Sequence, residues 1–165
     1  MCGIAGFVSN EKENKINLKN LGDSFCKILY HRGPDDNGIW IDKNQKNLLA
    51  HTRLSILDLD PRSKQPMIDY YNNLTIVFNG EIYNWRILKL HLQKQGYKFS
   101  TESDTEVLLK GFHYWNEKIL NMLEGMFSFG IYNFKTKELF CARDRIGKKP
   151  FVYTETPYGF VFASE

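Results

Sequence analysis

Strand-like runs separated by short turns occupy both ends of the chain, and this arrangement restricts the possible folds more than any other feature of the sequence. One run lies at the N-terminus, and four more follow Gly125. The predicted strands are 3–8, 38–42, 47–53, 74–78, 126–134, 138–143, 150–155 and 159–164. Short strands joined by tight turns pair as hairpins, so mainly antiparallel sheets are expected.

Helical periodicity is confined to the segments between these strands. Residues 18–30 and 84–95 each place apolar side chains on one helical face. Ser103 and Glu106 match the capping-box pattern that begins a third helix, and a short fourth helix is predicted at 117–123. A few helices combined with several hairpins indicate the α+β class, with two packed sheets and the helices on the outside.

Composition indicates a soluble globular domain. The chain has 165 residues, which suits one domain. Apolar residues make up 42% and charged residues 25%, which argues against a largely disordered chain. The apolar runs are far shorter than the ~20 residues of a membrane helix, so no transmembrane span is expected.

Charge and cysteine content narrow the possible functions. The net charge is +3 and the lysines are scattered, so a nucleic-acid partner is not expected. The three cysteines form no CxxC pair and, with the histidines, show no zinc-like spacing, so neither a disulfide framework nor a metal site is predicted. The N-terminus lacks the features of a signal peptide, and a cytoplasmic location is therefore predicted.

Cys2 is the first candidate catalytic residue. Removal of Met1 would leave a thiol and a free α-amine on one residue. An α-amine has a pKa of about 7.7–8.0 and is a suitable base at neutral pH for the thiol beside it. A single cysteine carries little specificity, however, and Cys2 by itself is equally compatible with an unremarkable second residue.

The Asn79-Gly80 pair supports two interpretations. The pair is typical of a two-residue hairpin turn. Alternatively, the Asn79 side-chain amide and the Gly80 backbone N–H could form an oxyanion hole, which stabilises charge that develops only in a transition state.

Three charged residues could bind an amino acid. Arg53 follows a predicted strand and could pair with a carboxylate, while Glu81 and Asp104 could bind an ammonium group. A surface ion pair would equally explain Arg53 and Glu81, and favourable helix N-terminal electrostatics would equally explain Asp104.

These signals occur in an order that resembles the class II glutamine amidotransferases, the N-terminal-nucleophile glutaminase domains. Within that family the sequence is most similar to the glutaminase domain of glutamine-hydrolysing asparagine synthase. The similarity covers nearly the whole chain. The matching segments include Met1-Cys2-Gly3-Ile4-Ala5-Gly6-Phe7, His31-Arg32-Gly33-Pro34-Asp35, Ala50-His51-Thr52-Arg53-Leu54, Gln65-Pro66-Met67, Phe78-Asn79-Gly80-Glu81-Ile82-Tyr83-Asn84, Ser103-Asp104-Thr105-Glu106, Gly125-Met126-Phe127, Ala142-Arg143-Asp144-Arg145 and Phe162-Ala163-Ser164-Glu165.

The resemblance implies a role for each matching position. Cys2 would attack the side-chain amide of L-glutamine to form a thioester, with its own α-amine relaying the proton. Asn79 and Gly80 would form the oxyanion hole. The residues implied to bind the substrate or support the site are Arg53 for the carboxylate, Glu81 and Asp104 for the ammonium, Leu54 and Ile56 through backbone groups, and Arg32 as a support.

The resemblance also implies a four-layer α-β-β-α sandwich, the N-terminal-nucleophile hydrolase fold. Residues 1–165 would form a glutaminase domain without a cofactor, at the N-terminal end of a longer chain. A C-terminal synthetase domain would bind ATP and Mg²⁺, receive the ammonia and make asparagine, and the full-length protein is a possible homodimer. Two alternatives stay open: the same glutaminase feeding a sugar or another carboxylate, and a non-catalytic docking module.

Overall fold

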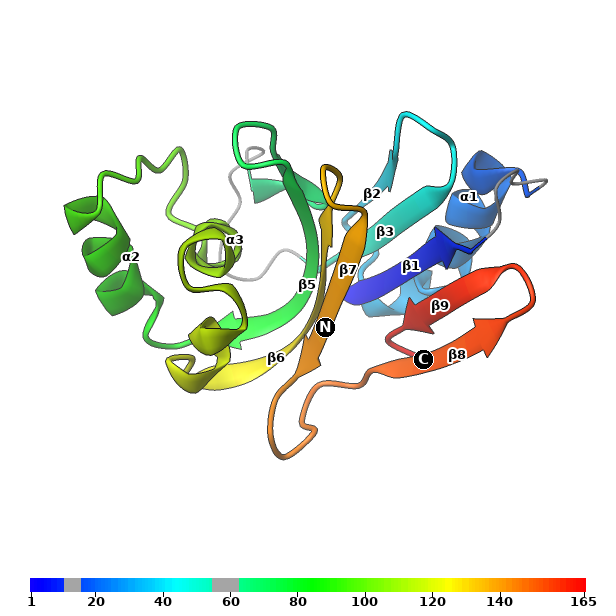
Figure 1. Ribbon diagram of the computed structural model, residues 1–165. Helices are drawn as coiled ribbons and strands as arrows, with labels where there is room; N and C mark the ends of the chain where they lie inside the picture. Colours follow the sequence, from blue (N-terminus) through cyan, green and yellow to red (C-terminus); the bar gives the residue numbers. More distant parts are fainter. Residues whose placement is uncertain (11–15, 55–62) are drawn as a thin grey trace.

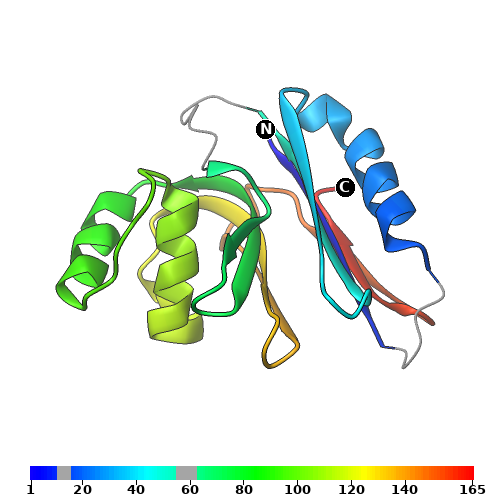
Figure 2. The same cartoon turned by 90° about the horizontal axis from the view of Figure 1, so that it is seen from above.

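The computed structural model describes residues 1–10, 16–54 and 63–165, and in this part of the chain two antiparallel sheets pack face to face between helices. The layers are seen edge-on in Figure 2, with α2 and α3 outside one sheet and α1 outside the other. The α+β class and the four-layer α-β-β-α sandwich predicted above are therefore confirmed.

The first sheet has the strand order β2-β3-β1-β9-β8 and the second has the order β4-β5-β6-β7 (Figure 1). The strands of the first sheet are β1 (Gly3–Ser9), β2 (Asp36–Ile41), β3 (Asn47–Arg53), β8 (Val152–Thr156) and β9 (Gly159–Ala163). Those of the second are β4 (Met67–Asp69), β5 (Leu74–Ile82), β6 (Gly125–Asn133) and β7 (Glu138–Arg143). The helices are α1 (Leu18–Ile28), α2 (Trp85–Lys94) and α3 (Asp104–Trp115), with short 3₁₀ helices at Tyr30–Arg32 and Asn116–Asn121.

The two ends of the chain meet in the centre of the first sheet. Strand β1 pairs with β3 on one side and with β9 on the other, so that Ala5 lies between Ala50 and Ala163. Beyond the end of β9, the Ser164 hydroxyl accepts a hydrogen bond from the Ile4 N–H at 3.0 Å. The first residues are thereby held on both sides, which positions the N-terminus against the second sheet.

Alternation along the strands divides the core into three layers. Ile4, Leu49, Val77, Tyr132 and Phe162 pack between the sheets. The opposite face of the second sheet packs against α2 and α3, and the opposite face of the first sheet packs against α1. Strand side chains point to alternate faces, so each strand contributes to two of these layers.

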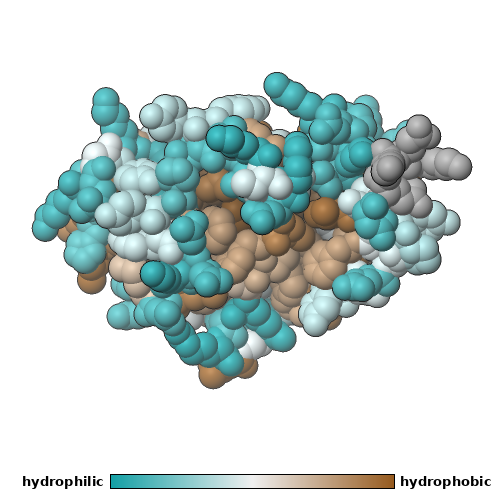
Figure 3. Space-filling view, in the orientation of Figure 1, coloured by the Kyte–Doolittle hydropathy of each residue, from teal (hydrophilic) through white to brown (hydrophobic). Residues whose placement is uncertain are grey.

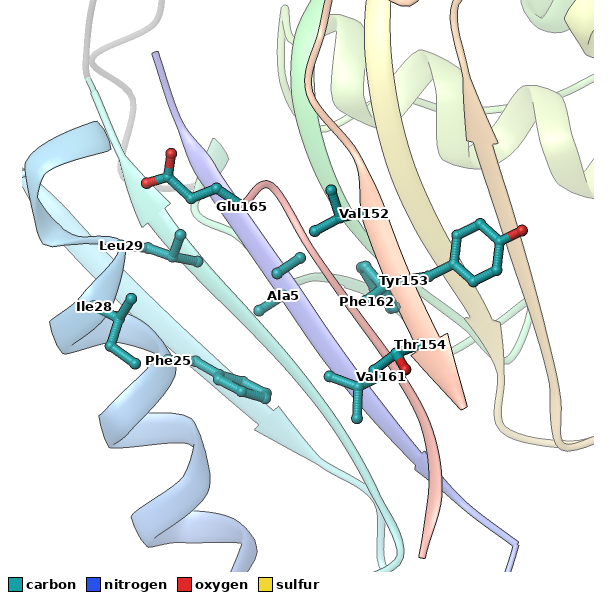
Figure 4. Close-up of a pocket in the computed structure, with 11 residues that line it drawn as sticks. Ala5, Phe25, Ile28, Leu29, Val152, Tyr153, Thr154, Val161, Phe162 and Glu165 are labelled. Atoms are coloured by element: carbon teal, nitrogen blue, oxygen red, sulfur yellow. The ribbon is translucent and has the colours of Figure 1, made fainter. Parts of the chain in front are cut away.

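Two of the places where apolar side chains reach the surface are a patch and a groove. Figure 3 shows them gathered in the middle of one face, where the second sheet lies beside β8 and β9; partly buried members of the inter-sheet core include Leu139, Cys141, Phe151 and Phe160. A separate groove of about 300 Å³ lies on the outer face of the first sheet between α1 and β8 (Figure 4). Its lining is almost entirely apolar and includes Phe25, Ile28 and Val161.

The structure corrects two local predictions. Asn79 and Gly80 do not form a hairpin turn, because β5 continues from Leu74 to Ile82 without interruption. The capping box is also wrong in part: Ser103 caps α3 by accepting from the Thr105 N–H, but the Glu106 side chain does not reach back to Ser103. Glu106 turns to the preceding loop, where its carboxylate accepts from the backbone N–H groups of Ser100 and Thr101.

The Glu106 side chain anchors the loop that contains Ser100 and Thr101 to α3. The carboxylate also accepts from the Thr101 hydroxyl at 2.7 Å and pairs with the Lys110 ammonium at 2.7 Å. Burial alone would raise the pKa of the Glu106 carboxyl, but Lys110 and the hydrogen bonds from Thr101 and Ser100 outweigh burial and hold the pKa below its ordinary value. The ionised carboxylate therefore stabilises the folded state.

We predict that Glu106→Gln lowers the free energy of unfolding at pH 7 by about 2 kcal/mol, because hydrogen bonds to a charged acceptor are lost. The folded pKa lies below the unfolded value, so this contribution is present above the unfolded pKa and is lost as pH falls through the folded one. Urea unfolding at several pH values should show the difference from the unsubstituted protein shrinking toward acid. Glu138→Gln, at an exposed side chain, is the matched control and should change stability little. A difference that stays constant down to pH 3 would contradict the assignment.

Candidate active site

The Cys2 thiol lies at the end of β3, next to backbone groups of Leu54. The pairing of Gly3 with Thr52 sets this position, because it brings the residue before β1 beside the residues that follow Thr52. The Leu54 N–H donates to Cys2 Sγ at 3.5 Å, and Sγ lies 3.9 Å from the Leu54 carbonyl oxygen. The thiol is half-buried, so it is held by the protein and still open to a small molecule.

Arg32 fixes the backbone of Cys2. Its Nε donates to the Cys2 carbonyl at 3.2 Å, and its Nη1 lies 3.4 Å from the carboxylate of Glu165. The same carboxylate pairs with His31 at 2.5 Å. Arg32 Nη2 is buried and has no hydrogen-bond partner among the described residues. The structure thus places Arg32 directly behind the predicted nucleophile.

Strand β5 presents a row of backbone donors at an open edge of the second sheet. The Tyr83 N–H bonds to the Glu124 carbonyl, which sets the alternation of the β5–β6 ladder: odd-numbered residues of β5 bond to β6, and even-numbered ones point away. At this outer edge the Phe78 N–H donates to the Gln65 side chain at 2.6 Å, and the Ile82 N–H donates to Asp104 Oδ2 at 3.0 Å. The Gly80 N–H lies between them on the same edge, past the end of β4.

Gly80 cannot be replaced without moving the strand. A Cβ at this position would lie 2.3 Å from the Met126 carbonyl oxygen and 2.8 Å from the Phe127 Cα. Both are backbone atoms of β6, which cannot yield as a flexible side chain could. The glycine is required by the close approach of two strands and not by turn geometry.

Asn79 points into the space between the sheets with an unsatisfied donor. Val77 lies in the inter-sheet core, and Asn79 follows it on the same face of β5. Asn79 is 1% exposed, and its Nδ2 makes no hydrogen bond to any described residue. A buried amide donor without an acceptor costs free energy, and such groups are rare unless a ligand or water satisfies them. With Gly80 beside it, Asn79 supplies one of two donors suited to a developing oxyanion.

Two carboxylates lie close to these donors. Glu81 continues β5 on the same face as Asn79, and Asp104 begins α3. Burial raises the pKa of the Asp104 carboxyl above its ordinary value, and the nearby Glu81 carboxylate raises it further, against hydrogen bonds from the Ile82 and Thr105 N–H groups. Two adjacent acids, one of them desolvated, favour binding of a cation.

His51 is a buried residue near the site to which the sequence analysis assigned no role. It lies on β3 between Leu49 and Arg53 on the face toward the second sheet. Burial, together with the nearby Arg53 guanidinium, lowers the pKa of His51 to about 3. The imidazole is therefore neutral at physiological pH, and Arg53 keeps a local positive field at the end of β3. His51 lies in the Ala50-His51-Thr52-Arg53 segment that matches the family, and this match could have indicated a role for it. A histidine in a strand, however, is more often a core residue than a functional one.

Gln65 is a second residue without an assigned role, although it lies in one of the segments that match the family. Its Oε1 accepts from the Phe78 N–H, and its Nε2 lies 3.4 Å from the Thr105 hydroxyl. It therefore ties the edge of β5 to α3, just before the oxyanion donors. One of the predicted site residues, Ile56, lies outside the described part of the chain, together with the rest of residues 55–62.

Within residues 1–10, 16–54 and 63–165, no three His, Cys, Asp or Glu side chains gather where they could hold a metal ion. Of the other two thiols, Cys26 is buried and Cys141 is half-buried, and desolvation raises the pKa of Cys141 to about 12. A search of the helices in the described ranges found none with the length and apolar character that crossing a membrane requires.

Comparison with known proteins agrees with this arrangement. The chain is 40% identical over 167 residues to asparagine synthetase [glutamine-hydrolyzing] 3 of Bacillus subtilis, covering all of this chain and 26% of that protein. It is 39% identical over 184 residues to the putative asparagine synthetase [glutamine-hydrolyzing] 2 of Methanocaldococcus jannaschii, again over the whole chain and 34% of the relative. The chain thus spans about a quarter to a third of the length of these relatives.

A solved structure shows the same fold. Glutamine phosphoribosylpyrophosphate amidotransferase of Bacillus subtilis superposes with a TM-score of 0.74 at 25% identity, over 99% of this chain and 42% of that one. The family described as "Glutamine amidotransferase domain" matches residues 1–165. The chain belongs to the glutamine amidotransferase family, and its domain is homologous to the glutaminase domains of asparagine synthetases.

Proposed function

We propose that this domain hydrolyses the side-chain amide of L-glutamine to glutamate and ammonia, with Cys2 as the nucleophile. The observation that supports this most strongly is the unsatisfied Asn79 amide donor, buried between the sheets beside the outward-facing Gly80 N–H. A docking module would gain nothing from keeping a buried donor unpaired at a cost in stability. The half-buried Cys2 thiol supplies the nucleophile that such an oxyanion hole requires.

In the proposed reaction, Cys2, Asn79 and Gly80 each have a separate part. Once Met1 is removed, the Cys2 α-amine takes the proton from the thiol, and Sγ bonds to the amide carbon of the substrate. The carbonyl oxygen becomes an oxyanion that accepts from Asn79 Nδ2 and the Gly80 N–H. The carbon–nitrogen bond then breaks, the leaving nitrogen takes the proton held by the α-amine, and ammonia departs. Water attacks the thioester and releases glutamate.

Charges at the site complement free glutamine. Arg53 would hold the α-carboxylate, while Glu81 and Asp104 would bind the α-ammonium. Leu54 would contribute backbone groups, since its N–H and carbonyl already lie at Cys2 Sγ. Arg32 would keep the Cys2 backbone in place through the 3.2 Å bond to its carbonyl. A substrate that carried only the α-carboxylate or only the α-ammonium would lack one of these ion pairs.

We further propose that the ammonia serves an ATP-dependent asparagine synthetase domain in a longer protein. The names of the relatives at 37–40% identity support this acceptor. ATP and Mg²⁺ would then belong to that domain, and a reducing cytoplasm would suit a catalytic thiol. A different acceptor is the second candidate, because the chain is also 32% identical over 174 residues to amidase chry2 of Gibberella zeae. Assaying the full-length protein for asparagine formation from aspartate, ATP and glutamine decides between them.

We predict that Cys2→Ala abolishes glutamine hydrolysis and leaves the fold intact, because the thioester cannot form. Ammonia release and thermal unfolding of the purified domain measure the two effects. Cys141→Ala is the matched control: its half-buried thiol, with a pKa raised to about 12, should be dispensable for the reaction. Retained hydrolysis in Cys2→Ala would refute the mechanism.

Retention of Met1 should have the same effect as loss of the thiol, because the nitrogen of Cys2 is then an amide and cannot accept a proton. Protein produced with methionine removal blocked can be checked by mass spectrometry and assayed beside processed protein. Equal rates for the two forms would show that the α-amine is not the base.

We predict that Asn79→Ala lowers kcat by about 10²–10³ with a much smaller change in KM, because the oxyanion exists only during the reaction. Steady-state kinetics with glutamine give both constants. Asn121→Ala, at an exposed side chain, serves as the control and should match the unsubstituted domain. If kcat is unchanged while KM rises, Asn79 binds the ground state and the oxyanion assignment is wrong.

A further inference from the structure

A buried lysine that has no acidic partner among the described residues lies against the N-terminus. Lys149 follows β7 in the chain and is 7% exposed. Its Nζ donates to the Met1 sulfur at 3.4 Å, and in the described ranges it forms no ion pair with a carboxylate. A thioether is a weak acceptor, and lysines are rarely buried unless they are paired. The contact with Met1 therefore does not explain why an ammonium group is kept at this place.

The backbone around Lys149 is held in place by several hydrogen bonds. The buried Asp144 carboxylate accepts from the Lys148 and Lys149 N–H groups at 2.8 and 3.0 Å. It also accepts from the Phe127 N–H at 3.3 Å, and Phe127 is the register partner of Gly80. The Lys149 carbonyl accepts from Arg143 Nε at 2.6 Å. The loop is thus tied to the strand that pairs with the oxyanion donors, and the position of Lys149 is set relative to the site.

Removal of Met1 changes what Lys149 faces. Met1 is bonded to the Cys2 nitrogen, so an ammonium that touches the Met1 side chain faces the end of the chain where the new α-amine is formed. The other charged groups around this end are Arg32 at the Cys2 carbonyl, Arg53 at the end of β3 with Asp36 beside it, and the acids Glu81, Asp104, Asp144 and Glu165. His51 on β3 is neutral, since its pKa is about 3.

The acids around the site have other partners. Glu165 is engaged by Arg32 and His31, and one oxygen of Asp104 accepts from the Ile82 N–H. Glu81 and Asp104 lie on the side of the site that would bind the substrate ammonium. The buried Asp144 carboxylate is turned to the backbone N–H groups of Lys148 and Lys149. The cations Arg32 and Lys149 contact the first two residues themselves, and like charges disfavour the protonated form of an amine beside them.

We propose that Lys149 is a positioning residue that acts through its charge: it holds the α-amine of processed Cys2 in the uncharged form that can accept the thiol proton. The inference rests on the proposed glutaminase function and adds a residue to it. In the resting enzyme the α-ammonium releases its proton to water. The free amine then takes the proton from Sγ–H as the sulfur–carbon bond forms.

The pH dependence of kcat/KM for glutamine tests the proposal, because this parameter reports the ionisation of the free enzyme. The processed domain is compared with Lys149→Met, Lys149→Arg and Lys148→Met. Lys148 is the exposed neighbour in the same loop and is the matched control. In Lys149→Met we expect the acidic limb of the profile to move to higher pH by about one unit, with activity recovering at alkaline pH. Lys149→Arg and Lys148→Met should keep the original midpoint.

Two results would overturn the inference. An unchanged midpoint in Lys149→Met would show that the charge does not act on the amine. A loss of activity by the same factor at every pH, with Lys149→Arg equally affected, would show a purely structural role. If Lys149→Met unfolds, Lys149→Gln is used, and an NMR titration of the ¹⁵N-labelled α-amine in the folded Cys2→Ser background measures the same shift directly. Failure of the proposed function is distinguishable, because the unsubstituted domain would then release no ammonia at any pH.

Discussion

The double pairing of β1 is the interaction on which the rest of the site depends. A chain terminus ordinarily frays, because few contacts oppose its conformational entropy. Here β1 lies in the middle of the first sheet between β3 and β9, and the Ile4 N–H is bonded to Ser164 near the other end of the chain. The backbone of Cys2 is further held by Arg32. The backbone of Cys2, the proposed nucleophile, is therefore as well positioned as that of a residue in the interior of a domain.

The layer between the sheets contains polar groups that destabilise the fold but are available to bind a substrate. Most of this layer is apolar, with Ile4, Val77 and Phe162 in contact. Toward one end the same faces carry buried polar groups that the described residues do not satisfy, including Asn79 Nδ2 and His51 Nε2. Each such group destabilises the folded state, and the apolar part of the layer compensates. A buried donor left unsatisfied by the protein is the feature expected of a site that binds a ligand there.

Electrostatics at the site separate two regions. Arg32 and Lys149 contact the first two residues, where the proposed mechanism needs a neutral amine. The acids Glu81, on β5, and Asp104, at the start of α3, lie where we propose that the substrate ammonium binds. Under these proposals the fold favours opposite charge states at two amines. The separation depends on strands of both sheets, because Arg53 belongs to β3 and Glu81 to β5.

The sequence by itself determined the fold class and most of the strands, since alternation is a property of short segments, although it did not indicate the three-residue strand β4. Through its resemblance to the family, the sequence also suggested the site residues, whose roles stay predictions. It failed at Asn79-Gly80, where an apparent turn is the interior of β5, because the close approach of β6 that demands a glycine is a contact between distant segments. It also assigned no role to His51, Gln65 or Lys149. A neutral histidine, a side chain bonded to a strand edge and a lysine buried against the N-terminus are consequences of burial and of pairing between remote strands, and only the tertiary structure decides these.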